Sequence, residues 1–395
     1  MCNRQAPNDL MLVEIVMPRL TEDSPARHSI EPSDRYVAVN GKRFHYIWLR
    51  DHCLCCRHPK ALQKKHDISD FPRTPKPLSI KLQNDNLIID WEEQPSHQSI
   101  FPISWLLSRA YDLQATQNPE FHRQTILWDN VWLEQNSPHW NDFDACDSKL
   151  WMNQLETLGF TLLRNLPWEN LDSFVSSIGP VYHLAGNGRY STIKVMEKAK
   201  ANDLAKSDRA LLPHTDVTYM SAPLLVQLLY CVENSASGGE SILVDGFRVI
   251  RDMQKDYPQH IKTLSQNEVK FYHLFPLELG KYFVSYKTPI VELTKAGELR
   301  SIHCSHKNFV CDLPFDKVEE IYEAYQNLFC YLKNTTYQYC FRMQPGDCLL
   351  IQNFRILHGR QAFDSSAGSR HLEIAYIPWD YFAGRRAFYH QIQKF

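Results

Sequence analysis

Short apolar runs separated by turn residues dominate the pattern of hydrophobic and polar positions along the chain. Residues 36–49 read as two strands around an Asn-Gly pair, which favours a two-residue hairpin turn. Residues 79–82 and 87–91 repeat this arrangement around an Asn-Asp-Asn turn. We therefore predict a small β-rich domain over residues 35–110, preceded by an N-terminal extension of residues 1–34.

A second domain is predicted over residues 146–395, after a connector of residues 111–145 that is rich in Trp, Asn and Gln. Residues 149–158 have the features of a helix that ends at Gly159. Residues 160–164 are then the first strand of this domain. The domain is therefore expected to open with one helix and to continue mainly as strands.

The remaining pattern of the second domain is mostly β. Residues 224–232 are almost all apolar, which suits a strand covered on both faces. Residues 318–332 have apolar positions at helical spacing and should pack on the outside of the sheets. Residues 345–347 form a Pro-Gly-Asp turn before the apolar residues 348–351. Many short strands with few helices predict a mainly β fold with flanking helices, either a sandwich or a barrel.

Composition and charge exclude several classes of function. With 44% hydrophobic and 12% aromatic residues among 395, the chain can bury a substantial core. Its 43 basic and 45 acidic residues give a net charge of −2, so nothing favours a nucleic-acid or anionic membrane partner. No run approaches the roughly 18 apolar residues of a membrane span, and the N-terminus is too polar for a secretory signal. Eleven scattered cysteines fit a reducing compartment, so we expect a soluble, cytoplasmic protein.

The candidate chemistry centres on an H-x-D triplet and one distant histidine. His214 and Asp216 alternate on a segment expected to be extended, so their side chains point to the same side. His358 lies far downstream, and a β-rich fold must bring it back. Two histidines and one carboxylate on one face of an octahedral ion leave three positions for substrates, an arrangement typical of non-haem Fe(II) oxygenases. The triplet alone is a weak signal in a chain with 17 histidines.

The surroundings strengthen this signal. A Ser-Gly-Gly-Glu-Ser turn at residues 237–241 leads into the apolar residues 242–244. Arg370 follows His358 at a spacing of 12 and precedes the strand-like residues 371–377. An arginine in this place could form a bidentate fork with a carboxylate held near the metal.

These segments resemble those of a known family, the taurine, γ-butyrobetaine and trimethyllysine dioxygenases. The resemblance is strongest to the γ-butyrobetaine branch, through the segments WLRDHCLCC, HTD, SGGESILVDGF, PGD, NFRILHGRQAF and SRHLEIAYIPWD. It extends in blocks from about residue 35 to about residue 385. The resemblance implies a double-stranded β-helix (jelly roll) for the second domain, Fe(II), 2-oxoglutarate and O2 as cofactors or co-substrates, and a homodimer.

The resemblance also implies roles for individual residues. His214, Asp216 and His358 would be the catalytic iron ligands, and Arg370 would bind the distal carboxylate of 2-oxoglutarate. Ser241 stands at a hydroxyl position that could donate to the same carboxylate, although a hydroxyl that closes the turn is an equal alternative. The implied reaction oxidises an unactivated C–H bond by hydroxylation or desaturation and releases succinate and CO2.

A dense cysteine cluster lies in the first domain. Cys53, Cys55 and Cys56 suggest a structural tetrahedral zinc site, and reduced, partly buried cysteines are the alternative. The resemblance adds His97 as the fourth ligand. This sequence departs from the family pattern because it lacks two residues between its second and third cysteine. His58 is therefore a second candidate for the histidine ligand.

The substrate residues depart from the family. The resemblance implies an aromatic cage, because a trimethylammonium group binds through the faces of aromatic rings. Tyr376, six residues past Arg370, matches one cage tyrosine. Lys206 and Arg189, however, stand where two further tyrosines are expected.

Cations at these positions would oppose a cationic substrate, so we predict a small anionic or amino-acid-like metabolite. The alternative is that Tyr190 and Tyr219 rebuild the cage, which would make the protein a γ-butyrobetaine hydroxylase of carnitine biosynthesis. A hypothesis of a different class is a non-catalytic binding protein that retains only the fold.

Overall fold

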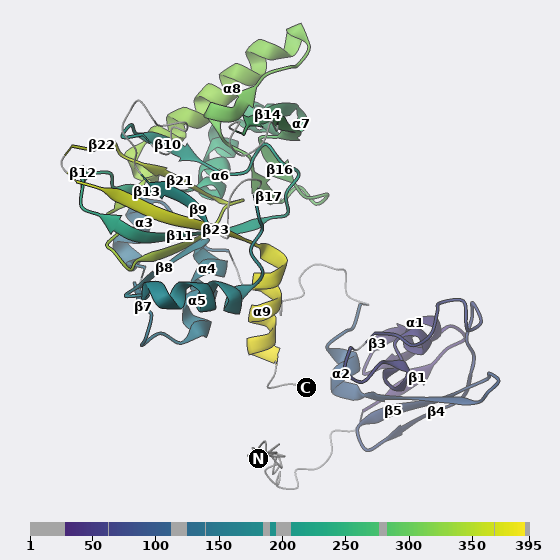
Figure 1. Cartoon of the computed structure of the whole chain (residues 1–395). Helices are drawn as coiled ribbons and strands as arrows, with labels where there is room; N and C mark the ends of the chain where they lie inside the picture. The colour runs from purple at the N-terminus through teal and green to yellow at the C-terminus, as the bar shows by residue number, and fades with distance from the viewer. Residues whose placement is uncertain are drawn as a thin grey trace, which may run out of the picture. The chain divides into compact units, whose positions relative to one another are not determined.

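The structure is a computed structural model, and it describes residues 28–61, 63–111, 125–138, 140–184, 190–194, 207–275, 283–366 and 368–391. The chain forms two compact units, Met1–Asn118 and Pro119–Phe395 (Figure 1). No helix among these residues is both long and apolar enough to cross a membrane. The finer domain boundaries given above stay a prediction.

The first unit contains two three-stranded antiparallel sheets. One is formed by β1 (Ile30–Pro32), β2 (Tyr36–Val39) and β3 (Lys42–His45), and the other by β4 (Pro77–Gln83), β5 (Asn86–Trp91) and β6 (His97–Pro102). Both sheets contribute to one core, which includes Phe44, Leu87, Trp91 and Phe101. The short helix α2 (Ile103–Leu107) follows β6 directly.

Both predicted hairpins of this unit are present. Strands β2 and β3 join through Asn40 and Gly41, which have the positive φ values that this two-residue turn requires. Residues 46–49, predicted as strand, instead begin the helix α1 (Tyr46–Asp51). The helix forms because Tyr46 and Leu49, three residues apart, bury on the same side.

The described part of the second unit is mainly β, with two main sheets, three minor ones and several helices. The larger sheet has the order β7 (Asn141–Asp142), β8 (Phe160–Arg164), β20 (Cys348–Gln352), β11 (Leu225–Asn234), β23 (Arg370–Pro378) and β9 (Ser191–Lys194). The smaller sheet has the order β10 (Leu211–His214), β21 (Ile356–Arg360), β13 (Ser241–Asp245) and β19 (Tyr339–Phe341). From β10 to β11 to β13, and from β19 to β20 to β21 to β23, each step passes from one sheet to the other. A double-stranded β-helix requires such alternation, and the assignment to that topology stays a prediction.

The two sheets enclose a core and are covered by helices on their outer faces (Figure 1). Leu229, Leu243, Ile351 and Ile374 belong to the core between the sheets. The helices α4 (Ser148–Leu158), α5 (Leu171–Ile178) and α9 (Trp379–Gln391) pack on the larger sheet, whereas α6 (Gly246–Asp256), α7 (Pro258–Gln266) and α8 (Phe315–Lys333) pack on the smaller. The predicted flanking helices therefore cover both sheets.

The helix and strand predicted at residues 149–164 form as α4 and β8, and Gly159 between them has φ 83°. The structure differs in the predicted connector. Trp128 and Leu133, the latter on α3 (Asn130–Asn136), lie in the core between the sheets. Trp128 is held there partly because its indole N–H donates to the Leu158 carbonyl, 2.7 Å away.

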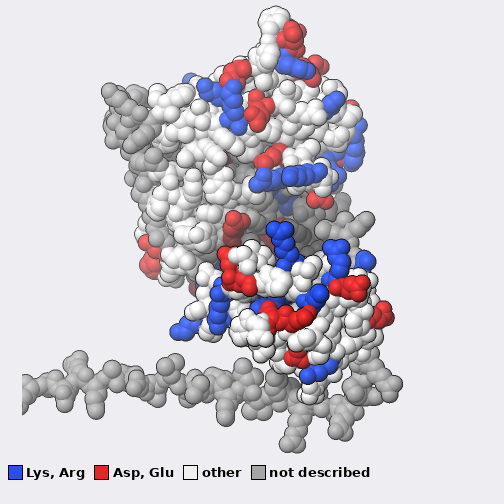
Figure 2. All heavy atoms as spheres, turned by 90° about the vertical axis from the view of Figure 1, so that its right-hand side faces the viewer, with Lys and Arg blue, Asp and Glu red and all other residues white. Residues whose placement is uncertain are grey.

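Several elements had no counterpart in the sequence pattern. They are β12 (Ser237–Gly238), β14 (Glu268–Leu274), β15 (Phe283–Pro289), β16 (Val291–Leu293), β17 (Leu299–Ile302), β18 (Phe309–Val310) and β22 (Phe363–Asp364). On the face of the molecule drawn in Figure 2, basic and acidic side chains of the described residues are interspersed.

A buried ion pair joins distant parts of the second unit. Arg355 donates to both carboxylate oxygens of Asp245, over 3.0 and 2.7 Å, and neither side chain is more than 1% exposed. Asp245 also accepts from the backbone N–H groups of Phe247 and Arg248 and so caps α6. The same carboxylate accepts from the backbone N–H of Trp128. The pair therefore connects the segment before α3 with β13, α6 and β21.

We expect Arg355→Met to lower the free energy of unfolding by about 3–5 kcal/mol, because the substitution leaves the buried Asp245 carboxylate without a counter-charge. Urea denaturation would measure this change. Arg164→Met is the matched control, because Arg164 is 45% exposed and lies 4.0 Å from Asp347, so its loss should cost less than about 1 kcal/mol. Equal costs for the two variants would contradict the prediction.

Candidate active site

The three predicted metal ligands meet at one end of the smaller sheet. Strands β10 and β21 are antiparallel, and His214 lies directly opposite His358 in their register. Asp216 follows β10 by two residues, and its carboxylate oxygens lie 3.4 Å from His214 Nε2 and 3.6 Å from His358 Nε2. All three ligand atoms lie within 4.8 Å of one another. The arrangement can hold a divalent metal ion with its remaining positions open.

Local contacts orient each ligand. The Nδ1 atom of His214 lies 2.8 Å from the Leu212 carbonyl, to which it donates as the N–H tautomer, leaving Nε2 free for a metal. Asn353 accepts from the backbone N–H of Asp216 and donates to the Asp216 carbonyl, each over 2.9 Å. Asn353 therefore braces the backbone of Asp216.

Two buried side chains hold the carboxylate of Asp216. Gln227 Nε2 and the Tyr376 hydroxyl each donate to Asp216 Oδ2 over 2.8 Å. The two donors lie directly opposite each other on β11 and β23. Tyr376 was predicted as a cage residue for the substrate, and this hydrogen bond gives it a role at the metal ligand. Gln227 was not predicted, although a glutamine within an apolar run was a visible signal.

The electrostatics of the site favour metal binding. Burial tends to raise the pKa of Asp216, but His358 and His214 outweigh burial and hold that pKa well below its ordinary value. Burial, together with His214, lowers the pKa of His358 to about 3. At neutral pH the site therefore presents a carboxylate and a neutral His358 imidazole, which are the ligand forms of both groups.

Arg370 lies buried at the start of β23, with 5% of its surface exposed. Its Nε is buried without a partner, and its guanidinium makes no hydrogen bond or ion pair with any residue in the described ranges. Burial lowers the pKa of Arg370 to about 10, so the group stays charged at neutral pH. A buried cation without a counter-ion is costly, so the site fits an anionic ligand.

Ser241 and Arg360 lie opposite each other on neighbouring strands. Ser241 is buried on β13, directly opposite Arg360 of β21. Arg360 donates to the carbonyls of Ser207 and Arg209, each over 2.7 Å, and so fastens the segment that leads into β10. Whether Ser241 serves 2-oxoglutarate stays a prediction.

The other predicted substrate residues separate into three groups. Tyr219, three residues beyond Asp216, stacks on His273 with ring centroids 4.7 Å apart. Tyr190 does not reach the metal ligands, because its hydroxyl donates to Asp172 of α5 over 2.6 Å and its ring packs in the core outside the larger sheet. Lys206 and Arg189 lie outside the described residues.

A lysine that was not predicted approaches the ligands. Lys307, on the short 3-10 helix η5 (His306–Asn308), places its Nζ 3.4 Å from Nε2 of His214. No periodicity or motif marks this residue, because its position depends on the conformation of an irregular segment.

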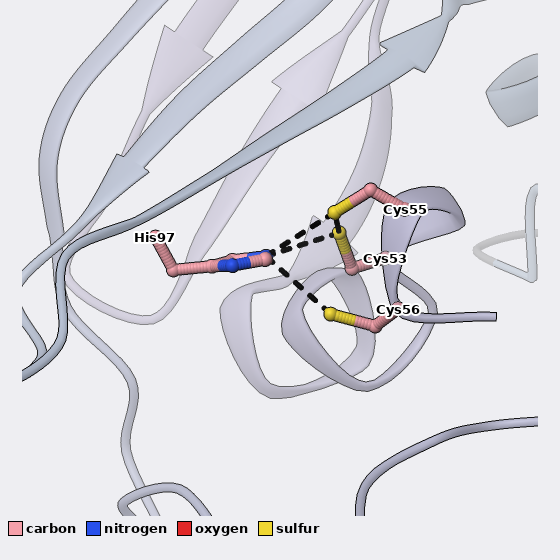
Figure 3. Close-up of side chains that lie close together, drawn as sticks. All are labelled: Cys53, Cys55, Cys56 and His97. Atoms are coloured by element: carbon pink, nitrogen blue, oxygen red, sulfur yellow. Dashed lines mark hydrogen bonds between the residues drawn. The ribbon is translucent and has the colours of Figure 1, made fainter.

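The predicted cysteine cluster also assembles, in the first unit (Figure 3). The short 3-10 helix η1 (Leu54–Cys56) turns the sulfurs of Cys53, Cys55 and Cys56 toward Nε2 of His97 at distances of 3.2, 3.8 and 3.6 Å. Burial raises the pKa of the Cys55 thiol to about 12, and the neighbouring Cys53 adds to this shift. His58 is not in the group, and its ring accepts from the backbone N–H of Ala61.

Comparison with known proteins assigns the second unit. Residues 133–376, more than half of the chain, match the family described as "Taurine catabolism dioxygenase TauD, TfdA family". The chain belongs to this family. It is an enzyme, a 2-oxoglutarate-dependent dioxygenase.

The chain is similar to dioxygenases that are named for γ-butyrobetaine and for trimethyllysine. The γ-butyrobetaine dioxygenase of Homo sapiens is 28% identical over 347 residues, which cover 85% of this chain and 88% of that protein. The mitochondrial trimethyllysine dioxygenase of Rattus norvegicus is 26% identical over 353 residues, covering 86% of this chain and 80% of that protein. Two solved structures of PvcB, an Fe, alpha-ketoglutarate dependent oxygenase of Pseudomonas aeruginosa, share 17% identity and cover 67% of this chain and 94% of theirs, with TM-scores of 0.45 and 0.46.

In this dioxygenase, we expect Tyr376→Phe and Gln227→Leu each to weaken the binding of Fe(II) about tenfold, because each removes one of the two donors that orient Asp216. Anaerobic titration calorimetry with Fe(II) would measure the affinity. Tyr230→Phe is the control, because the Tyr230 hydroxyl donates to the Leu166 carbonyl on the outer side of β11. An unchanged Fe(II) affinity in both variants would show that Asp216 needs neither donor.

Proposed function

We propose that His214, Asp216 and His358 hold Fe(II) and that Arg370 binds 2-oxoglutarate, for oxidation of a small anionic or amino-acid-like metabolite. The observation that best supports this proposal is the assembled ligand set together with a buried guanidinium that has no anionic partner among the described residues. A non-catalytic binding protein would not need both features.

Bound together, Fe(II) and 2-oxoglutarate supply the oxidising chemistry, in which O2 is consumed, succinate and CO2 are released and a C–H bond is hydroxylated or desaturated. The residues of this chain bind and orient these groups. The Leu212 carbonyl fixes the tautomer of His214, and Gln227 and Tyr376 fix the carboxylate of Asp216. Arg370 can bind a distal carboxylate through two parallel N–H donors.

The anionic substrate was predicted from Lys206 and Arg189, which lie outside the described residues. Lys307 adds a cation beside the metal ligands, which favours a substrate with at least one acidic group. The second candidate is γ-butyrobetaine hydroxylation, the activity that the names of several relatives suggest. It is supported by the aromatic group formed by Tyr219, His273 and Phe275, whose rings could contact a trimethylammonium group.

We also propose that Cys53, Cys55, Cys56 and His97 hold a structural zinc ion. In a tetrahedral zinc site, bond lengths of about 2.3 Å to sulfur and 2.0–2.1 Å to nitrogen give edges of about 3.8 Å between sulfurs and about 3.6 Å between sulfur and nitrogen. The sulfur–nitrogen distances of 3.2–3.8 Å in the cluster support this proposal. All four positions are filled by protein groups, so the ion would stabilise the fold rather than bind a substrate.

The cytoplasmic location and the homodimer stay predictions. The names of the trimethyllysine dioxygenases among the relatives include the word mitochondrial. The names of the relatives therefore do not indicate one common compartment.

We expect the purified protein to convert 2-oxoglutarate to succinate in an Fe(II)-dependent reaction that substrates stimulate, measured across betaines, amino acids and phosphonates. His214→Ala should abolish succinate formation, because it removes a metal ligand. Arg370→Gln should raise the KM for 2-oxoglutarate roughly 100-fold, since a charge-assisted contact contributes about 3 kcal/mol. His183→Ala is the control, because His183 is exposed and outside the ligand group.

Two results would overturn this proposal in part or whole. Succinate formation that survives His214→Ala would remove the metal assignment. Efficient turnover of γ-butyrobetaine with no stimulation by other acids would replace the anionic substrate with the second candidate.

For the first unit, we expect about one zinc ion per chain by elemental analysis, and Cys53→Ser to remove it. The same substitution should lower the melting temperature of the protein, because the ion links η1 to β6. Cys330→Ser is the control, since Cys330 is exposed on α8. Wild-type protein that contains no zinc after purification without chelators would contradict the assignment.

A further inference from the structure

Lys307 combines a solvent-exposed stem with an amino group inside the active site. The residue is exposed overall, yet its Nζ lies 3.4 Å from His214 Nε2. The positive charge of Lys307 lowers the pKa of both Asp216 and His358. Within the described residues no carboxylate lies at ion-pair distance from this ammonium group. Lys307 therefore extends from the rim of the site toward the metal ligands.

The segment that carries Lys307 is fixed to the metal-binding triplet itself. Thr215, the residue between the two ligands of the triplet, donates its backbone N–H to the Cys304 carbonyl over 2.8 Å. In return the Cys304 backbone N–H donates to the Thr215 hydroxyl over 2.9 Å. Both residues are at most 2% exposed. The backbone of the lysine segment is thus held at a set distance from His214.

Hydrogen bonds also hold the end of the segment that follows Lys307. Ser305 donates to the side chain of Asn308 over 2.9 Å, and Asn308 donates to the Tyr272 carbonyl of β14 over 2.8 Å. Lys307 lies between these two anchors. Because the backbone is held on both sides of Lys307, only the rotamers of its side chain can change the position of its ammonium group.

Metal binding changes what this lysine can contact. A metal ion on His214 would occupy the Nε2 lone pair, and its positive charge would repel the ammonium group. Fe(II), the Asp216 carboxylate and one carboxylate of 2-oxoglutarate together have no net charge, and Arg370 matches the distal carboxylate. The charge of Lys307, next to the metal ligand His214, would then be unmatched.

We propose that Lys307 binds an acidic group of the substrate next to the iron and so selects for a carboxylate, or a comparable anion, close to the oxidised C–H bond. The proposal rests on the proposed function, because it assumes an iron and 2-oxoglutarate at the site. It gives Lys307 and Arg370 different partners, the substrate and the co-substrate. It holds whether the remainder of the substrate is cationic, neutral or acidic.

Three probes of one shape test this selectivity. γ-Butyrobetaine has a carboxylate and a cation, its methyl ester has only the cation, and 5,5-dimethylhexanoate has only the carboxylate. Their binding to the Co(II)- and 2-oxoglutarate-loaded protein under anaerobic conditions would be measured by calorimetry. We expect the wild type to bind at least one carboxylate probe about tenfold or more tightly than the ester.

The variants separate the charge of Lys307 from its shape. Lys307→Gln should weaken binding of the carboxylate probe about 10- to 100-fold, the range for loss of one charge-assisted contact. Lys307→Arg should restore most of this loss, and the dissociation constant for 2-oxoglutarate should not change. Lys317→Gln is the matched control, because Lys317 pairs with Glu320 on α8.

A wild type that shows no preference for either carboxylate probe over the ester would overturn the proposal, as would equal binding in Lys307→Gln. An increase in the dissociation constant for 2-oxoglutarate would assign Lys307 to the co-substrate instead. These outcomes differ from failure of the proposed function, which would appear as a wild type without Fe(II)-dependent succinate formation.

Discussion

The antiparallel pairing of β10 with β21 is the constraint on which the rest of the active site depends. It sets His214 opposite His358, although the two residues are distant in the chain. Because side chains alternate between the faces of a strand, a shift of the register by one residue would turn one histidine away from the other. The covering helices and the buried pair of Asp245 and Arg355 support this register, since both residues of the pair lie at strand ends or turns beside it.

The second unit contains several buried charged side chains, and they differ in whether another side chain balances them. Asp245 and Arg355 neutralise each other, whereas Asp216 is paired only with His214 and His358, and Arg370 has no anionic partner among the described residues. An unmatched buried charge costs stability in the empty protein and is offset when an ion or an anionic ligand binds. The proposed binding sites for the metal ion and the co-substrate are therefore the places where the protein's own side chains do not balance a buried charge.

The sequence was sufficient for features that depend on local pattern. The Asn-Gly hairpin, the helix ended by Gly159 and the alternation of His214 with Asp216 each follow from neighbouring residues. Contacts between distant residues were predicted only where the family resemblance supplied them, as for His358 and His97. The position of Lys307 depends on an irregular segment that is bonded to Thr215 through Cys304, and no sequence pattern shows this contact. Tyr190 bonds to Asp172, and the sequence could not show which way a residue next to a strand faces.

Strand β23 carries both Arg370 at its start and Tyr376 six residues later, on the same face toward the other sheet. One residue is the proposed contact of the co-substrate, and the other holds the metal-binding carboxylate. The spacing between the co-substrate contact and the residue that holds the metal ligand is therefore set by a single strand. A single residue inserted between these two positions would turn one of the two side chains to the opposite face of the strand.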